Sequence, residues 1–258
     1  MKLNSLLLPI LSAALVASAQ AGSPGKAPAM CQPAPEASPL GVTATLAYDT
    51  DYIFRGVQFA QNLVSGNIEV AVPIDKTFSL DFNAWYGASV DDSAAPFAGG
   101  GSYGELDLSA ALLAKVCSNL TLGLKYTWYD YVGNAGKSLG DVNEVGVTLA
   151  TTVAMLDLNA GVYYDFTAQG WYYEAGVSHA FKINDWLSLV PGAAISFGTD
   201  YYGVNGGNTV KVSLAAPIRL CKTATLTPYI AGNLPYGSLK DAGEKSRVYG
   251  GVSLSITF

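Results

Sequence analysis

Charged residues are scarce in this chain of 258 residues. Only 13% of the residues are Asp, Glu, Lys or Arg, whereas a soluble domain usually carries about a quarter, and 50% of the chain is hydrophobic. The formal net charge is −6 and no cluster of Lys or Arg occurs, which argues against nucleic acid as a partner. One histidine and three scattered cysteines offer no set of metal ligands, so we expect no metal and no cofactor. This composition indicates contact with lipid.

Long apolar runs are also missing beyond the N-terminus. A membrane-spanning helix needs about 18–20 apolar residues, and after Ala21 a charged, polar or glycine residue interrupts every candidate. At the N-terminus, Lys2 precedes an apolar segment and the sequence Ala19-Gln20-Ala21, which predicts a signal peptide over residues 1–21. Residues 22–40 are rich in Pro, Ala, Ser and Gly and predict a flexible periplasmic lead-in. We therefore expect an exported protein whose folded domain, residues 41–258, lies in the cell outer membrane.

The sequence does contain a repeated alternation of apolar and polar residues. From Phe78 to Val90 every even position is apolar or aromatic, and every odd position except Trp85 is polar or glycine. A period of two places these sets on opposite faces of a β-strand. The pattern predicts about twelve strands, each long enough to cross a bilayer. They are expected at Val42–Phe54, Leu63–Val72, Phe78–Val90, Leu106–Val116, Leu120–Trp128, Val145–Val153, Leu156–Phe166, Trp171–Ile183, Leu187–Phe197, Val210–Leu220, Ala224–Leu234 and Val248–Phe258.

The connections between these strands alternate in length. The tight links are Pro73–Thr77, Cys117–Asn119, Ala154–Met155, Asn184–Trp186 and Cys221–Thr223. The longer links are Asp91–Tyr103, Val132–Val142, Thr199–Asn208 and Pro235–Ser246. Short periplasmic turns and longer external loops are typical of outer-membrane barrels, and in lipid every backbone polar group must be paired, so the sheet must close. We predict an all-β, up-and-down antiparallel transmembrane β-barrel with both termini in the periplasm, in preference to a soluble two-sheet sandwich.

The last strand ends on an aromatic residue. Counting back from Phe258, the residues Ile256, Leu254 and Val252 are apolar and in phase with it. This pattern resembles the C-terminal signal by which the barrel-assembly machinery recognises its substrates. We therefore expect that machinery and outer-membrane lipid to be partners of the chain.

A second resemblance lies in the first strand, at Asp51-Tyr52-Ile53-Phe54-Arg55-Gly56. This stretch is similar to the Asp-Tyr-x-Phe-Arg-Gly motif that opens members of the TorF family of porins. The resemblance implies an outer-membrane β-barrel with a porin role and names no substrate. From their chemistry, we expect Tyr52 and Phe54 at the outer aromatic girdle. Asp51 and Arg55 share a face and either pair with each other, fixing the first loop, or pair with lumen charges at the pore mouth.

The face of the strands that is expected to point inward carries charges of both signs. Mixed charge suits a hydrated pore or a network of ion pairs that plugs the barrel, and the diameter decides between them. We predict a narrow channel for passive diffusion of small polar solutes or ions. The candidate pore-lining residues are Asp81, Asn83, Glu105, Asp107, Lys115, Lys125, Glu144, Asp157, Asp165, Glu174, Lys182, Lys211, Arg219 and Arg247.

Two other functions remain open. One is a structural or adhesive surface barrel that binds an external ligand through loops such as Asp91–Tyr103 and Tyr201–Gly207. The other is an outer-membrane hydrolase. It has little support, because His179 is in phase with outward-facing residues. Outer-membrane phospholipases resemble one another in a His-x-Ser pair, and the second residue after His179 is Phe181, not serine. We expect no catalytic residue.

The three cysteines would lie in the oxidising periplasm. Cys117 and Cys221 fall in tight turns on roughly opposite sides of the expected ring, beyond the limit of about 7 Å between the Cα atoms of a disulfide. Cys31 lies in the lead-in and can reach either of them. We predict one disulfide between Cys31 and one of the other two cysteines.

Overall fold

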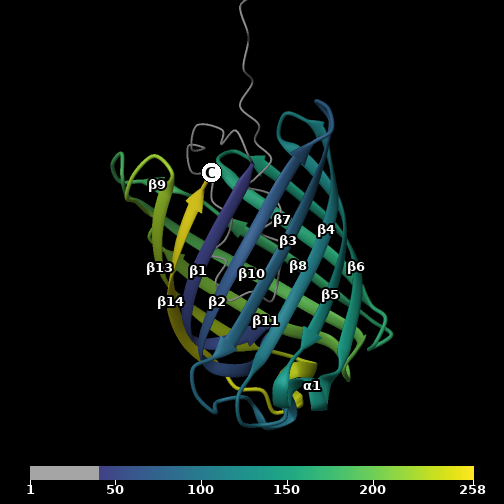
Figure 1. Cartoon of the computed structure of the whole chain (residues 1–258). Coiled ribbons are helices and arrows are strands. Elements are labelled where there is room, and N and C mark those ends of the chain that lie inside the picture. The colour runs from purple at the N-terminus through teal and green to yellow at the C-terminus, as the bar shows by residue number, and fades with distance from the viewer. Residues whose placement is uncertain (1–40) are drawn as a thin grey trace, which may run out of the picture.

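The computed structural model describes residues 41–258, which form one closed antiparallel β-barrel (Figure 1). The expected signal peptide and lead-in lie outside this range. Two strands are only two residues long: β9 (Phe181–Lys182) follows β8, and β12 (Ile218–Arg219) follows β11. The twelve long strands are β1 (Val42–Phe54), β2 (Val57–Pro73), β3 (Phe78–Ser89), β4 (Gly104–Cys117), β5 (Leu120–Tyr131), β6 (Asp141–Val153), β7 (Leu156–Asp165), β8 (Gly170–Ser178), β10 (Ser188–Tyr201), β11 (Val204–Ala215), β13 (Ala224–Pro235) and β14 (Arg247–Thr257).

Each long strand pairs with its neighbours in the chain, and the last pairs with the first. The closing ladder joins β1 to β14 from Thr43 opposite Thr257 to Asp49 opposite Gly251. The prediction of a closed up-and-down barrel with twelve strands is therefore confirmed. In the described part of the chain, no helix is long and apolar enough to cross a membrane.

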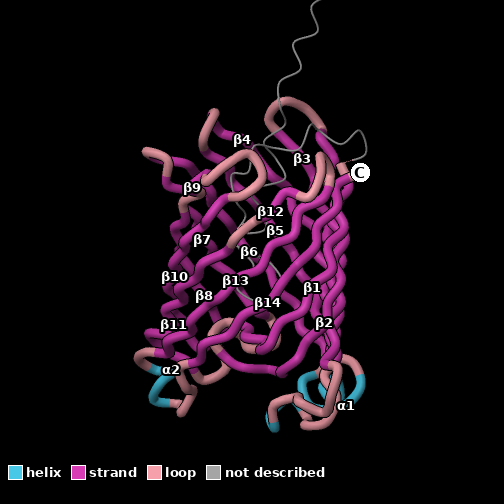
Figure 2. The backbone as a smooth tube through the Cα atoms, turned by 90° about the vertical axis from the view of Figure 1, so that its left-hand side faces the viewer, coloured by secondary structure: helices cyan, strands magenta, loops and turns pink. Residues whose placement is uncertain are grey.

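The two ends of the barrel differ. The turn end, at the top of Figure 1, has the tight links and the C-terminus. The loop end, at the bottom, has three short helices, which Figure 2 shows in cyan: η2 (Pro96–Ala98), α1 (Gly133–Leu139) and α2 (Ser238–Asp241). Not every expected long link is long. The prediction for Thr199–Asn208 is wrong, because β10 and β11 extend until only Tyr202 and Gly203 connect them, both with positive φ as in tight hairpins.

The outside of the barrel is apolar and the inside is polar, as the alternation requires. Leu46 is 66% exposed and Ile68 is 54% exposed on the outer face, whereas their chain neighbours Ala47 and Asn67 are buried inside. An apolar outer face of this kind is stable in lipid and would be costly in water. Near the loop end, the outward rings of Tyr164 and Trp171 lie 4.9 Å apart and form part of an aromatic girdle.

Candidate pore constriction

The end of the β1–β2 hairpin leaves the wall and enters the barrel. We call the segment Thr50–Asn62 the hairpin tip. Consecutive residues are buried in it, at Tyr52 and Ile53, at Arg55 and Gly56, and at Phe59 and Ala60. A wall strand would expose every second residue to lipid, so burial of neighbouring residues means that both faces of the tip lie inside. The dark strands that cross the bottom of the barrel in Figure 1 are this hairpin.

The expectation that Tyr52 and Phe54 lie at the outer girdle is therefore wrong. Tyr52 is fully buried in the lumen, and its ring stacks on Trp85 at 5.7 Å between centroids. The Tyr52 hydroxyl donates a hydrogen bond to Glu105 (2.5 Å), which also accepts one from Tyr103 (2.8 Å). The alternation between outer and inner faces does not apply to Tyr52 and Phe54, because β1 has left the wall before it reaches them.

One face of the hairpin tip completes an aromatic cluster that fills one side of the mouth. Phe54 packs against Tyr129 (5.7 Å between centroids), and Phe59 packs against Tyr131 (6.2 Å). The loop-end helices cover the cluster, since Ala98 of η2 and Ala135 of α1 are buried in it. We call this set the mouth cluster; its rings are Tyr52, Phe54, Phe59, Trp85, Tyr103, Tyr129 and Tyr131.

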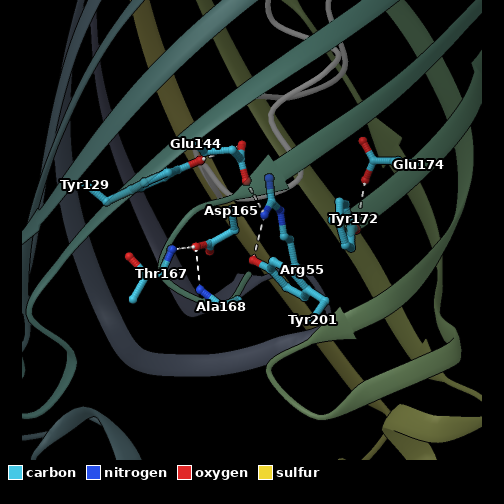
Figure 3. Close-up of polar contacts among 9 residues, drawn as sticks. All are labelled: Arg55, Tyr129, Glu144, Asp165, Thr167, Ala168, Tyr172, Glu174 and Tyr201. Atoms are coloured by element: carbon cyan, nitrogen blue, oxygen red, sulfur yellow. Dashed lines mark hydrogen bonds and ion pairs between the residues drawn. The ribbon is translucent and has the colours of Figure 1, made fainter. Parts of the chain in front are cut away.

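Arg55, at the turn of the hairpin, reaches the far wall (Figure 3). Its Nη1 lies 2.5 Å from a carboxylate oxygen of Glu144 on β6 and donates a hydrogen bond to the Tyr201 hydroxyl on β10 (2.6 Å). The side chains of Arg55 and Glu144 are only 4% and 3% exposed. Because β3, β4 and β5 separate β2 from β6 in the wall, the contact must span the lumen.

Aromatic rings surround the Arg55 guanidinium as well. The guanidinium carbon lies 4.4 Å from the ring centroid of Tyr172 and 5.1 Å from that of Tyr163, within the range of a cation–π interaction. Burial disfavours the charge of the guanidinium and the adjacent Glu144 carboxylate favours it, and arginine is not deprotonated in proteins. Arg55 is therefore a permanent cation in the middle of the mouth.

Gly56 and Asp51 of the motif make polar contacts with β13 and within the hairpin, respectively. The Gly56 carbonyl accepts a hydrogen bond from the Asn233 side chain (2.8 Å). Gly56 has φ +89°, and a Cβ there would lie 2.8 Å from Leu239, so only glycine fits. Asp51 accepts hydrogen bonds from Gln58 and Gln61, so Arg55 pairs with a lumen charge and not with Asp51.

The other candidate lining residues lie near the turn end, at the loop end or on the inner wall between the two ends. Lys115 and Asp157 are half-buried near the turn end, and Lys182 and Arg219 stand at its rim on β9 and β12. Arg247 lies at the loop end, 3.5 Å from Glu244. Those on the inner wall between the ends are Asp81, Asn83, Glu105, Asp107, Lys125, Glu144, Asp165, Glu174 and Lys211.

Several of these inner-wall residues have structural partners. Asn83 donates to Asn67 (2.6 Å), and Asp165 accepts from the backbone N–H groups of Thr167 and Ala168 (2.8 and 2.9 Å; Figure 3). Asp49 was not among the candidate lining residues, but it is buried and accepts a hydrogen bond from the Tyr229 hydroxyl. Its odd position in β1, in phase with Thr43 and Thr45, was the available signal.

Within residues 41–258, His179 contacts a backbone carbonyl and a phenyl ring. Its Nδ1 lies 2.6 Å from the Met155 carbonyl oxygen, and its ring contacts Phe181 at 4.4 Å between centroids. Among the described residues, no three His, Cys, Asp or Glu side chains could together hold a metal ion. Cys117 and Cys221 are exposed at the turn end and unpaired within residues 41–258, and Cys31 lies outside this range.

The barrel is similar to solved outer-membrane proteins. The COG4313 outer membrane channel from Pseudomonas putida F1 matches with a TM-score of 0.56 and 15% identity, over 86% of this chain and 97% of that one. The KdgM porin has a TM-score of 0.51 and 8% identity, over 84% and 99%. LpxR from Salmonella typhimurium has a TM-score of 0.50 and 8% identity, over 84% and 100%. No protein-family model and no curated protein matches the sequence.

These likenesses concern the fold. The chain has the fold of outer-membrane channels and porins, which supports an outer-membrane location. At identities of 8–15% they assign no solute and no mechanism. The fold is also shared by a protein whose name does not describe a channel, so the function has to be argued from the interior of the barrel.

Proposed function

We propose that the protein is an outer-membrane, porin-like channel for passive diffusion of small hydrophilic solutes or ions. The observation that carries the proposal is the polar inner wall of a closed barrel. Toward the turn end this wall is made of small polar residues that solvent reaches, among them Thr43, Thr45, Ser79, Thr121 and Ser213. Twelve strands give a diameter between filled barrels of eight strands and open porins of sixteen. The channel is narrow, and the hairpin tip sets its narrowest part.

The proposal includes how the chain reaches the membrane and which family it belongs to. The signal peptide is cleaved after Ala21, and the barrel-assembly machinery recognises the strand that ends at Phe258. On the basis of the motif Asp51–Gly56, we also propose that the chain is related to the TorF family. The support for this kinship is that Arg55 and Gly56, its last two residues, make the contacts that hold the hairpin tip in the lumen.

Conductance of a planar lipid bilayer tests the channel function. Purified protein, shown to be folded by its heat-dependent migration in SDS gels, is added to one side of the membrane. We expect stepwise current increases that grow in proportion to salt concentration. A bilayer that stays sealed at every voltage, with the wild type and with the variants described below, contradicts the proposal.

A surface barrel that binds an external ligand is the second candidate. The packing at the mouth favours it, because the mouth cluster and the Arg55–Glu144 pair occupy the loop end. Of the two loops proposed for such binding, only Asp91–Tyr103 is long; Tyr201–Gly207 is almost entirely strand. Binding that is lost when this loop is shortened, together with a sealed bilayer, would select this function. We propose no enzymatic role, since His179 contacts a backbone carbonyl and a phenyl ring at the turn end.

A further inference from the structure

The hairpin tip is joined to the wall by strand pairing at its base only. Strand pairing of β1 with β14 ends at Asp49 opposite Gly251, and pairing of β2 with β3 ends at Leu63 opposite Ser89. Beyond these points the ladders of the described strands join the two arms of the hairpin to each other and to no wall strand. A segment attached in this way can turn about its base without breaking the closed ring.

The base of the tip also has the features of a hinge. The residues Thr50 and Asn62 face each other but are skipped in the β1–β2 ladder, and Asn62 has φ +49°. A second irregularity in the register follows between Tyr52 and Ile53. Such irregularities bend a strand locally and weaken its pairing. They lie where the hairpin leaves the wall.

Side chains therefore hold the tip in the lumen. The Arg55–Glu144 ion pair and the Arg55–Tyr201 hydrogen bond attach it to the far wall, and the Asn233–Gly56 hydrogen bond attaches it to β13. The loop after β3 adds a hydrogen bond from the Ala95 N–H group to the Phe59 carbonyl (2.7 Å). Of these contacts, only the ion pair joins two buried charges.

We propose that the hairpin tip is a gate at the loop end of the channel and that the Arg55–Glu144 ion pair is its latch. This inference rests on the proposed channel function and adds its regulation. With the latch closed, Arg55 and the mouth cluster fill the cross-section. With the latch broken, the guanidinium moves to water and the tip turns out about Thr50 and Asn62, leaving the polar wall of β6 to β10 to line a wider passage.

A buried ion pair suits a latch for a physical reason. Removing two charges from water costs nearly as much as their attraction returns, so an inserted pair and a hydrated, separated pair are close in free energy. When one partner is lost, the other is left as an unpaired buried charge, which strongly favours the hydrated state. The position of the tip is therefore sensitive to a single carboxylate, Glu144.

Single-channel recording of four variants tests the gate. Glu144→Gln keeps the shape of the side chain and removes the charge, and Arg55→Met removes the cation and keeps an apolar stem. We expect each to raise the fraction of time spent in the open state about tenfold or more. The matched controls Asp241→Asn and Lys137→Met remove exposed loop-end charges on α2 and α1. The controls should behave as the wild type does.

Two further measurements distinguish a latch from a general loosening of the barrel. The double variant Arg55→Met/Glu144→Gln should open no more than either single variant, since both substitutions break the same contact. Because Arg55 carries charge through the membrane field, its removal should also flatten the voltage dependence of opening. Heat-dependent gel migration shows whether each variant is a folded barrel.

The outcomes distinguish the gate from the channel function on which it rests. A silent or rarely open wild type with open Glu144→Gln and Arg55→Met supports both. Equal open fractions in the wild type and all variants overturn the gate and leave the channel intact. Additive effects of the two substitutions also overturn the latch. No conductance in any folded variant overturns the channel function and the gate together.

Discussion

Trp85 shows what one inward aromatic side chain contributes to the barrel. It breaks the polar pattern of its strand, and its ring stacks on Tyr52 with 2% of its surface exposed. The hairpin tip supplies the partner that an inward tryptophan needs. The lone exception in the alternation of Phe78–Val90 therefore marks the strand on which the hairpin rests.

Substitution of Trp85 by alanine should destabilise the barrel by about 3–5 kcal/mol, because it removes a buried ring and leaves a cavity. Urea unfolding of protein refolded in lipid vesicles measures this. Trp171→Ala is the matched control, since that ring is 43% exposed on the outer face. Equal losses for the two variants would show that Trp85 is not packed as described.

The Cys221 thiol should react with an alkylating agent at a lower pH than an ordinary cysteine thiol does. Hydrogen bonds from the backbone N–H and hydroxyl of Thr223, and from the N–H of Ala224, lower the pKa of its exposed thiol. In a Cys31→Ser/Cys117→Ser variant, the rate of alkylation by iodoacetamide should reach half its maximum below pH about 8.5, the ordinary midpoint. Thr223→Ala should raise that midpoint. A midpoint at or above the ordinary value contradicts the geometry of this turn.

The predicted disulfide of Cys31 is tested by counting thiols. Within residues 41–258, Cys117 and Cys221 have no disulfide partner, which leaves both available to Cys31. Denatured, unreduced protein should show one free thiol. Three free thiols would exclude the bridge.

Among the strands, those of the wall were predictable and the hairpin tip was not. Strands such as β3 and β5 could be predicted because one face meets lipid and the other faces the lumen, so the side chains alternate. In the tip both faces are inside, and consecutive residues such as Tyr52, Ile53 and Phe54 are all apolar. Because both faces of the tip pack inside, no alternation marks it in the sequence.

The partners of Arg55 could not be predicted from the sequence. The pattern offered Asp51 or any lumen charge, and the choice of Glu144 depends on how far the tip reaches across the ring. That reach follows from the number of strands, the tilt of the wall and the place of the hinge. None of these is a local property of the residues around Arg55.

The terminal strand offers a test of assembly that is separate from stability. The Phe258 side chain is half exposed, and its backbone N–H makes one hydrogen bond, to Val42. Deletion of Phe258 should therefore leave refolding in detergent unchanged and sharply reduce the folded barrel in the outer-membrane fraction of cells. Phe258→Tyr, which keeps a terminal ring, should restore it. Normal assembly of the deletion variant would show that the residue is no assembly signal.

The inner wall of the barrel carries more acidic than basic residues. The buried charged residues comprise six acids and two bases: Asp49, Asp81, Glu105, Asp107, Glu144 and Asp165 against Arg55 and Lys125. A narrow passage with low-dielectric walls concentrates the field of such charges. The channel should therefore prefer cations.

Reversal potentials in a gradient of KCl measure this preference. We expect the sign that corresponds to K⁺ permeation, and a smaller potential for Asp107→Asn. The control Asp241→Asn, an exposed acid on α2, should match the wild type. A potential of the opposite sign would mean that Arg55 and Lys125 dominate the passage.

The contacts of Arg55 with Glu144 and Tyr201 across the lumen must form late in the folding of the chain. Tyr201 follows Arg55 by 146 residues, and Glu144 lies on the far wall, so neither is in place until most of the ring has formed. Contacts between residues so distant in sequence form late, because a long loop must close first. A half-built barrel has no partner for the guanidinium, which then remains hydrated. Burial of the Arg55 side chain therefore shows that the ring of strands is complete.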